Sequence, residues 1–200
     1  MIRSFREDVK RCFRQGEIKT GLTRTKIIVK ALSENTLWII FLYRISRWVR
    51  YGCQVPILRF LLRILCSIFR KPLFFLHGTQ IDLDAEIGPG FYIGHYGGIW
   101  IGPAKIGSNC NIAHNVTIGI GGKGEFRGIP EIGDNVYIGP GAIIFGKIKL
   151  GDNVAIGANA VVSKSMPDNA IVVGNPARIV GYEGSKDLIE LQDGDREIFK

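Results

Sequence analysis

Long apolar runs and cysteine motifs are scarce in this sequence. The uncharged stretch Asn35–Tyr43 has nine residues, whereas a helix that spans a membrane needs about 20. The first twenty residues are rich in charge and contain no apolar core, so we expect no signal peptide. The four cysteines show no CxxC spacing, which favours reduced thiols in a cytoplasmic protein. These absences argue against a transmembrane, secreted or disulfide-stapled protein.

Acidic residues are scarce in residues 1–74, which hold 16 Lys and Arg against 4 Asp and Glu, a net charge of +12. Residues 75–200 carry a net charge of −4, so the total of +8 describes an N-terminal arm. A basic arm suits nucleic acid or an anionic membrane, and its aliphatic and aromatic content favours the membrane and not nucleic acid. Arg59, Arg63 and Arg70 fall within about 40° on a helical wheel, which is typical of an interfacial helix. The alternative is that these helices pack on the rest of the protein or on neighbouring chains.

Glycine is abundant, at 26 of 200 residues, and accompanies a six-residue repeat. An aliphatic residue recurs every six positions, except for one step of seven and one of fourteen. The series is Ile81, Ile87, Ile93, Ile99, Ile106, Ile112, Ile118, Ile132, Ile138, Ile144, Leu150, Ile156 and Val162. A six-residue unit is too short to be stable alone, so such units form coils of about 18 residues that stack and share backbone hydrogen bonds. The repeat therefore predicts a parallel β-helix.

The repeat also predicts the domain organisation. We expect an α-helical region at 1–74, a β-helix at 75–181 and a C-terminal tail at 182–200. The fourteen-residue step requires the segment 119–131, GIGGKGEFRGIPE, to leave the coil as a loop. Glycines in such a loop let backbone amides approach a ligand.

The three histidines, His77, His95 and His114, are 18 and 19 residues apart. We expect them at the same position of successive coils, with neighbours about 4.8 Å apart. His77 and His114 would then be about 10 Å apart, whereas zinc ligands lie about 2 Å from the metal. We therefore expect no metal site within one chain.

The repeat resembles the hexapeptide-repeat acyltransferase superfamily, which implies a mainly β, left-handed parallel β-helix and acetyl-CoA as co-substrate. The segment Ile93–Gly102, IGHYGGIWIG, resembles the catalytic segment of serine acetyltransferases. The resemblance implies that His95 is the general base that takes the proton from an acceptor hydroxyl. His114 is the second catalytic candidate, one coil away. A metal shared between chains, as in the hexapeptide-repeat carbonic anhydrases, is the alternative use of these histidines.

The segment 157–167 looks like the closing coil of the acetyl-CoA enzymes in this superfamily. By similarity to galactoside and maltose acetyltransferases, Ala158 would offer backbone to the pantetheine arm. Ser163 and Lys164 would lie along that arm, and Arg178, in the terminal signature, would face the nucleotide phosphates.

The remaining site candidates lie near the histidines or in the loop. We expect Gly121 and Gly122 to contact the coenzyme. We expect Asp82, Tyr96 and Arg127 to bind the acceptor. Asp82 is also the nearest carboxylate that could orient His95. A homotrimer is expected because related proteins build the coenzyme site between chains.

This sequence departs from serine acetyltransferases on the acceptor side. Gln80 stands where they carry an aspartate that pairs with the histidine, and Gly94 stands where they carry the acid that helps hold serine. The loop reads Arg127-Gly128-Ile129-Pro130, without their second histidine. These departures favour the serine-acetyltransferase-like enzymes of polysaccharide gene clusters, which acetylate sugar hydroxyls.

We therefore predict an acetyl-CoA-dependent O-acetyltransferase of polysaccharide biosynthesis. Its acceptor would be a sugar or lipid-linked saccharide. We expect a cytoplasmic protein that also contacts the inner face of the cell membrane through residues 1–74. The alternatives are a serine O-acetyltransferase of cysteine biosynthesis and a non-catalytic hexapeptide-repeat scaffold.

Overall fold

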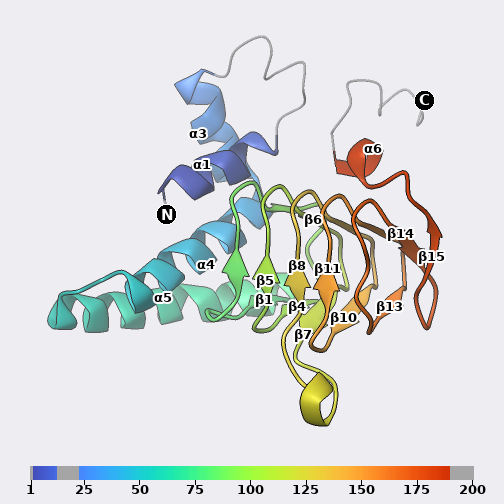
Figure 1. The fold of residues 1–200 in the computed structure, drawn as a ribbon. Helices are drawn as coiled ribbons and strands as arrows, with labels where there is room; N and C mark the ends of the chain where they lie inside the picture. Colours follow the sequence, from blue (N-terminus) through green and yellow to red (C-terminus); the bar gives the residue numbers. More distant parts are fainter. Residues whose placement is uncertain (1, 13–22, 190–200) are drawn as a thin grey trace.

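The computed structural model describes residues 2–12 and 23–189, and it consists of a helical arm followed by a parallel solenoid (Figure 1). The helices of the arm are α1 (Ile2–Lys10), α3 (Arg24–Ser33), α4 (Asn35–Tyr51) and α5 (Pro56–His77). Figure 1 shows α4 and α5 running side by side away from the first coil. The expected tail contains α6 (Lys186–Ile189) up to the last described residue.

The solenoid consists of short strands in three sheets, which form the three faces of a prism. Sheet A contains β1 (Thr79–Ile81), β4 (Ile99–Ile101), β7 (Thr117–Gly119), β10 (Ile143–Phe145) and β13 (Val161–Val162). Sheet B contains β2 (Glu86–Ile87), β5 (Lys105–Ile106), β8 (Glu131–Ile132) and β11 (Lys149–Leu150). Sheet C contains β3 (Tyr92–Ile93), β6 (Asn111–Ile112), β9 (Tyr137–Ile138), β12 (Ala155–Ile156), β14 (Ile171–Val173) and β15 (Arg178–Gly181). All neighbours are parallel except β15, which pairs antiparallel to β14.

The aliphatic repeat forms the core of the prism. Every member of the predicted series from Ile81 to Val162 is buried, with at most 8% of its surface exposed. Parallel pairing stacks these side chains in three columns, as in the register of Ile106 with both Ile87 and Ile132. The structure therefore confirms the predicted repeat.

Two steps of the repeat, those before and after β4, differ from the prediction. Ile101, not Ile99, pairs with Ile81 and with Ile118. The extra length therefore lies in the corner directly before β4, where Gly97 and Gly98 adopt φ of 112° and 65°. Ile99 is buried as well, so hydrophobicity alone does not identify which of the two inward isoleucines pairs with Ile81 and Ile118.

The boundary between arm and solenoid also lies later than expected. The apolar run at Phe74 and Phe75 continues α5, which ends only at His77 and is capped by Gly78. Gly78 adopts a left-handed φ of 56°, and its N–H donates to the carbonyl of Phe74 at 2.8 Å. This cap ends a helix at little cost because glycine has no Cβ. His77 therefore lies in the last turn of α5, and its predicted place on the first coil is wrong.

The outer surface of α5 is rich in large apolar side chains. Those more than 40% exposed include Ile57, Phe60, Leu61, Ile64, Ile68 and Phe69. Arg70, expected in a membrane-facing arginine stripe, instead donates to the carbonyl of Ile81 at 3.0 Å. Among the described residues, no helix is long and apolar enough to cross a membrane. Contact of the arm with a membrane surface stays a prediction.

The four cysteines, all of them within the described residues, form no disulfide. Burial raises the pKa of the Cys110 thiol to about 12. Cys110 is therefore a small core residue with an unreactive thiol.

A buried ion pair fastens the arm to the first coil. Arg44 of α4 donates to both carboxylate oxygens of Asp8 in α1, at 2.7 and 2.9 Å. The same guanidinium donates to the carbonyls of Ile87 and Gly88, at 2.7 and 2.6 Å. Asp8 also accepts the N–H of Phe91 at 2.9 Å. The Asp8–Arg44 ion pair thus joins α1, α4 and the corner after β2 through hydrogen bonds.

We predict that Asp8→Ala lowers the free energy of unfolding by about 3–5 kcal/mol, because it leaves the Arg44 charge buried without its partner. Urea denaturation followed by tryptophan fluorescence measures this, since Trp38 and Trp48 lie on α4. Glu7→Ala is the matched control. Glu7 pairs with Lys10 at the surface, where both side chains are about 40% exposed, so its loss should cost less than about 1 kcal/mol. Equal unfolding free energies for the two variants would contradict the prediction.

Candidate active site

Two histidines lie side by side at the corner between sheets C and A. His95 follows β3 and His114 follows β6, and the register pairs Ile93 with Ile112. Their ring centroids are 6.1 Å apart. His95 is exposed and His114 is half-buried. The predicted neighbouring positions on successive coils are therefore present for this pair.

Backbone hydrogen bonds extend this corner along the prism. The N–H of Asn115 donates to the carbonyl of Gly97 at 2.8 Å, and the N–H of Gly141 donates to the carbonyl of His114 at 3.0 Å. The N–H of Asn159 donates to Pro140 at 2.8 Å in the same way. Ala158 therefore lies on the same edge as both histidines, two coils beyond His114, and is exposed.

His77 reaches the same corner from the helical arm. Its ring lies edge-on to the ring of Tyr96, with centroids 4.7 Å apart. The N–H of Gly97 donates to the hydroxyl of Thr79 at 3.3 Å. The end of α5 thus packs against the segment that follows His95, and Tyr96 remains 46% exposed.

A cavity of about 350 Å³ opens beside His95. It is lined on one side by Gly94, His95 and Tyr96 and on the other by the junction of α3 and α4. The residues of that junction are Ser33, Glu34, Asn35 and Thr36. An exposed imidazole in a polar cavity of this size has room for a small acceptor molecule.

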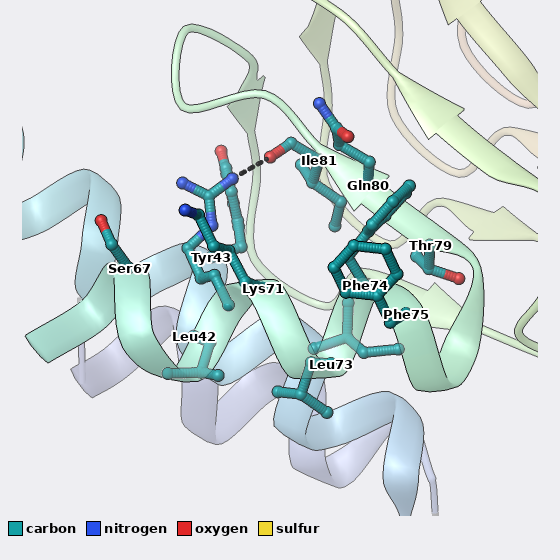
Figure 2. Close-up of a pocket in the computed structure, with 12 residues that line it drawn as sticks. Leu42, Tyr43, Ser67, Lys71, Leu73, Phe74, Phe75, Thr79, Gln80 and Ile81 are labelled. Atoms are coloured by element: carbon teal, nitrogen blue, oxygen red, sulfur yellow. Dashed lines mark hydrogen bonds between the residues drawn. The ribbon is translucent and has the colours of Figure 1, made fainter.

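A second cavity, of about 480 Å³, lies between α4, α5 and β1 (Figure 2). Its lining is mostly apolar, and Figure 2 shows Gln80 beside Ile81 with Phe74 and Phe75 from α5. Burial lowers the pKa of Arg70, which also lines this cavity. Gln80 and His95 therefore line different cavities.

Asp82 lies at the far end of β1 from the histidine corner. Its carboxylate accepts the N–H of Asp84 at 2.8 Å, which closes the turn after the strand. Asp82 does not lie beside His95 in the structure. The geometry therefore gives no support to the prediction that Asp82 orients His95.

The glycine-rich loop leaves sheet A at the end opposite the histidines. Gly121 and Gly128 pair antiparallel across its base, and a 3-10 turn forms at Gly124–Phe126. Arg127 follows this turn and is exposed. Figure 1 shows the loop projecting from the solenoid. Within one chain the loop and the two histidines therefore occupy opposite edges of the same face.

The remaining coenzyme candidates are exposed but spread over two faces. Ser163 and Lys164 follow β13, on the same edge as the loop. Arg178 lies in β15 opposite Val173, at the end of sheet C. Within residues 2–12 and 23–189, no group of three or more His, Cys, Asp and Glu side chains is placed to hold a metal ion.

This chain is similar to known proteins in both sequence and structure. The bacterial transferase hexapeptide (six repeats) family matches residues 130–164. A serine acetyltransferase of Staphylococcus epidermidis is 34% identical over 188 residues, which are 93% of this chain and 82% of that protein. Serine acetyltransferase from Brucella abortus, in complex with coenzyme A, has a TM-score of 0.72 at 27% identity and covers 91% of this chain and 68% of its own. The Neisseria gonorrhoeae enzyme, in complex with serine, has a TM-score of 0.67 at 27% identity and covers 90% and 68%.

These likenesses confirm the left-handed parallel β-helix and the N-terminal helices as a shared fold. The similarity to the staphylococcal protein includes the arm as well as the repeat, because it extends over nearly the whole chain. This chain belongs to the serine acetyltransferase family of hexapeptide-repeat acyltransferases.

Proposed function

We propose that this chain transfers the acetyl group of acetyl-CoA to the hydroxyl of L-serine. O-acetyl transfer from acetyl-CoA follows from its family, whereas the acceptor is our proposal. The observation that carries it is the exposed imidazole of His95 at a polar cavity, on a chain similar to serine acetyltransferases along nearly its whole length. The earlier expectation of a sugar acceptor has weaker support from these relatives.

His95 performs the proton transfers in this proposal. Its neutral imidazole takes the proton of the serine hydroxyl as that oxygen attacks the thioester carbonyl. The tetrahedral intermediate then expels the coenzyme A thiolate, and the imidazolium returns the proton to sulfur. The products are O-acetylserine and coenzyme A. His114, whose ring centroid is 6.1 Å from that of His95, orients the acceptor or shares the proton.

The donor binds along the edge that carries both histidines. Ala158, on that edge, offers backbone to the pantetheine arm, and Arg178 supplies charge for the phosphates. Lys164 follows β13 on the loop edge, so it supplies its charge from an adjoining chain. Since the loop lies on the opposite edge of sheet A, Gly121 and Gly122 reach a donor only where two chains adjoin. We therefore propose a homotrimer with its sites between chains.

A sugar hydroxyl is the second candidate acceptor. Two residues favour it, because Gln80 and Gly94 stand where the resemblance to serine acetyltransferases leads us to expect acids. Neither an amide nor a glycine offers the negative charge that an amino acid's ammonium requires. The acceptor would then be a free or lipid-linked saccharide of a surface polysaccharide.

We expect L-serine to be acetylated with a kcat/KM at least tenfold above that of glucose, galactose or N-acetylglucosamine. The assay follows release of the coenzyme A thiol with a colorimetric thiol reagent, and mass spectrometry identifies the acetylated product. Preferential acetylation of a sugar would replace the serine proposal with the second candidate. Acetyl-CoA hydrolysis without acceptor dependence would contradict both.

His95→Ala should lower kcat by about 10²–10⁴-fold, because it removes the general base. Calorimetry should show nearly unchanged acetyl-CoA affinity. His114→Ala should be milder or comparable. His77→Ala should matter least, since His77 lies in α5 and is not among the residues that line the cavity beside His95. The pH–rate profile of each variant assigns the titrating group. Full kcat in His95→Ala together with loss in His114→Ala would make His114 the base.

Gly122→Ala should raise the KM for acetyl-CoA by roughly tenfold. Gly122 has φ of +85°, and a Cβ there would lie 2.2 Å from the carbonyl oxygen of Phe126, so the substitution distorts the loop. The unfolding midpoint should stay near that of the unsubstituted protein, because the loop lies outside the coil stack. Gly119→Ala is the control, since a Cβ at Gly119 meets nothing within 4 Å. Equal KM values of the two variants for acetyl-CoA would show that the loop takes no part in donor binding.

A further inference from the structure

The cavity between α4, α5 and β1 takes no part in the proposed reaction (Figure 2). Of the described residues, none lines both this cavity and the one beside His95. Its volume of about 480 Å³ is within the range of about 300–1,000 Å³ that is typical of small-molecule sites. Apolar side chains of both helices and of β1 form most of its lining, namely Ile39, Leu42, Leu73, Phe74, Phe75 and Ile81. An aliphatic chain placed there would be removed from water.

Among the described residues that line this cavity, two carry a positive charge and none carries a carboxylate. The two cations, Arg70 and Lys71, are consecutive residues of α5. Neither forms a salt bridge with another residue in the part of the chain that the structure describes. Arg70 is half-buried and donates to the carbonyl of Ile81 at 3.0 Å, so its remaining N–H groups can bind a further acceptor. Burial lowers the pKa of Arg70, and an anion beside the guanidinium would offset this cost of desolvation.

The hydroxyl groups of the lining are already used within the protein. Tyr43, Ser67 and Thr79 each donate to a backbone carbonyl, at 2.7, 2.8 and 3.2 Å. The amide of Gln80 is neutral. The charge that the lining offers is therefore positive, and the complementary ligand is an anion with an apolar body.

We infer that this cavity binds a fatty acid, with its carboxylate on Arg70 and Lys71 and its aliphatic chain between α4, α5 and β1. This site goes beyond the proposed function and does not depend on which acceptor is acetylated. A guanidinium can bind a carboxylate through two parallel charge-assisted hydrogen bonds, and the ammonium of Lys71 adds a second positive charge. Ser67 and Lys71 also line a groove of about 440 Å³ on the outer face of α5, so the charged end of the cavity continues to the surface.

Isothermal titration calorimetry of the full chain tests this inference with decanoate and 1-decanol, which has the same chain length and no charge. We expect decanoate to bind about 10–100-fold more tightly, as for a hydrogen bond between charged groups. Octanoate should bind about 15-fold more weakly than decanoate, because each buried methylene strengthens binding about fourfold. The first comparison measures the charge of the site, and the second measures its burial of the chain.

The double variant Arg70→Gln, Lys71→Gln removes both charges from the lining. It should bind decanoate no more tightly than 1-decanol, and its affinity for 1-decanol should not change, which reports that the cavity is intact. Arg59→Gln is the matched control, since Arg59 is exposed on the same helix and lines neither the cavity nor the groove. It should leave the affinity for both ligands unchanged.

Equal affinity of the unsubstituted protein for decanoate and 1-decanol overturns the inference, and this result needs no variant to fold. Decanoate binding that the double variant leaves unchanged overturns it as well. Sedimentation with phosphatidylglycerol vesicles provides the remaining comparison. Binding to these vesicles without binding to monomeric decanoate would assign the two cations to a membrane surface and overturn the fatty-acid site.

Discussion

The stacking of inward aliphatic side chains is the constraint on which the rest of this structure depends. A coil of three short strands cannot bury its own core, so each coil is stable only against its neighbours. The side chains from Ile81 to Val162 fill this shared core, and backbone hydrogen bonds join every coil to the next. Positions one coil apart in the sequence are therefore neighbours in space. Residues about 18 apart in the sequence therefore line up along one edge of the prism, where catalytic side chains can lie next to one another.

The histidine pair is a direct result of this constraint. His95 and His114 are neighbours because Ile93 and Ile112 are stacked, not because the two histidines attract each other. The same rule places Ala158 on their edge and the loop on the other edge of sheet A. A site that used both edges would be completed by a neighbouring chain, and oligomerisation would then serve catalysis as well as stability.

The periodicity of the sequence predicted the coils, the loop and the histidine pair, because each follows from counting residues along a repeat. It misplaced His77, since an apolar run before the repeat suits a helix as well as a coil, and only the left-handed cap at Gly78 decides between them. The abundance of glycine drew attention away from a second corner residue. Asparagine occupies six corners in left-handed conformation, among them Asn135 and Asn153, whose side chains hydrogen-bond at 3.1 Å. The recurrence of asparagine three residues after the inward aliphatic residue is a sequence pattern that predicts these left-handed corners.

The cavity beside His95 could not be found from the repeat, because one of its walls comes from the arm, which has no repeat and whose placement depends on tertiary contacts. The ion pair of Asp8 with Arg44 fixes α4 against the first coil, and this in turn sets what lies opposite His95. The coil stack therefore determines where His95 stands, whereas the arm determines what lines the cavity beside it. Substitutions at the start of α4 would change that lining and leave the aliphatic core of the solenoid untouched.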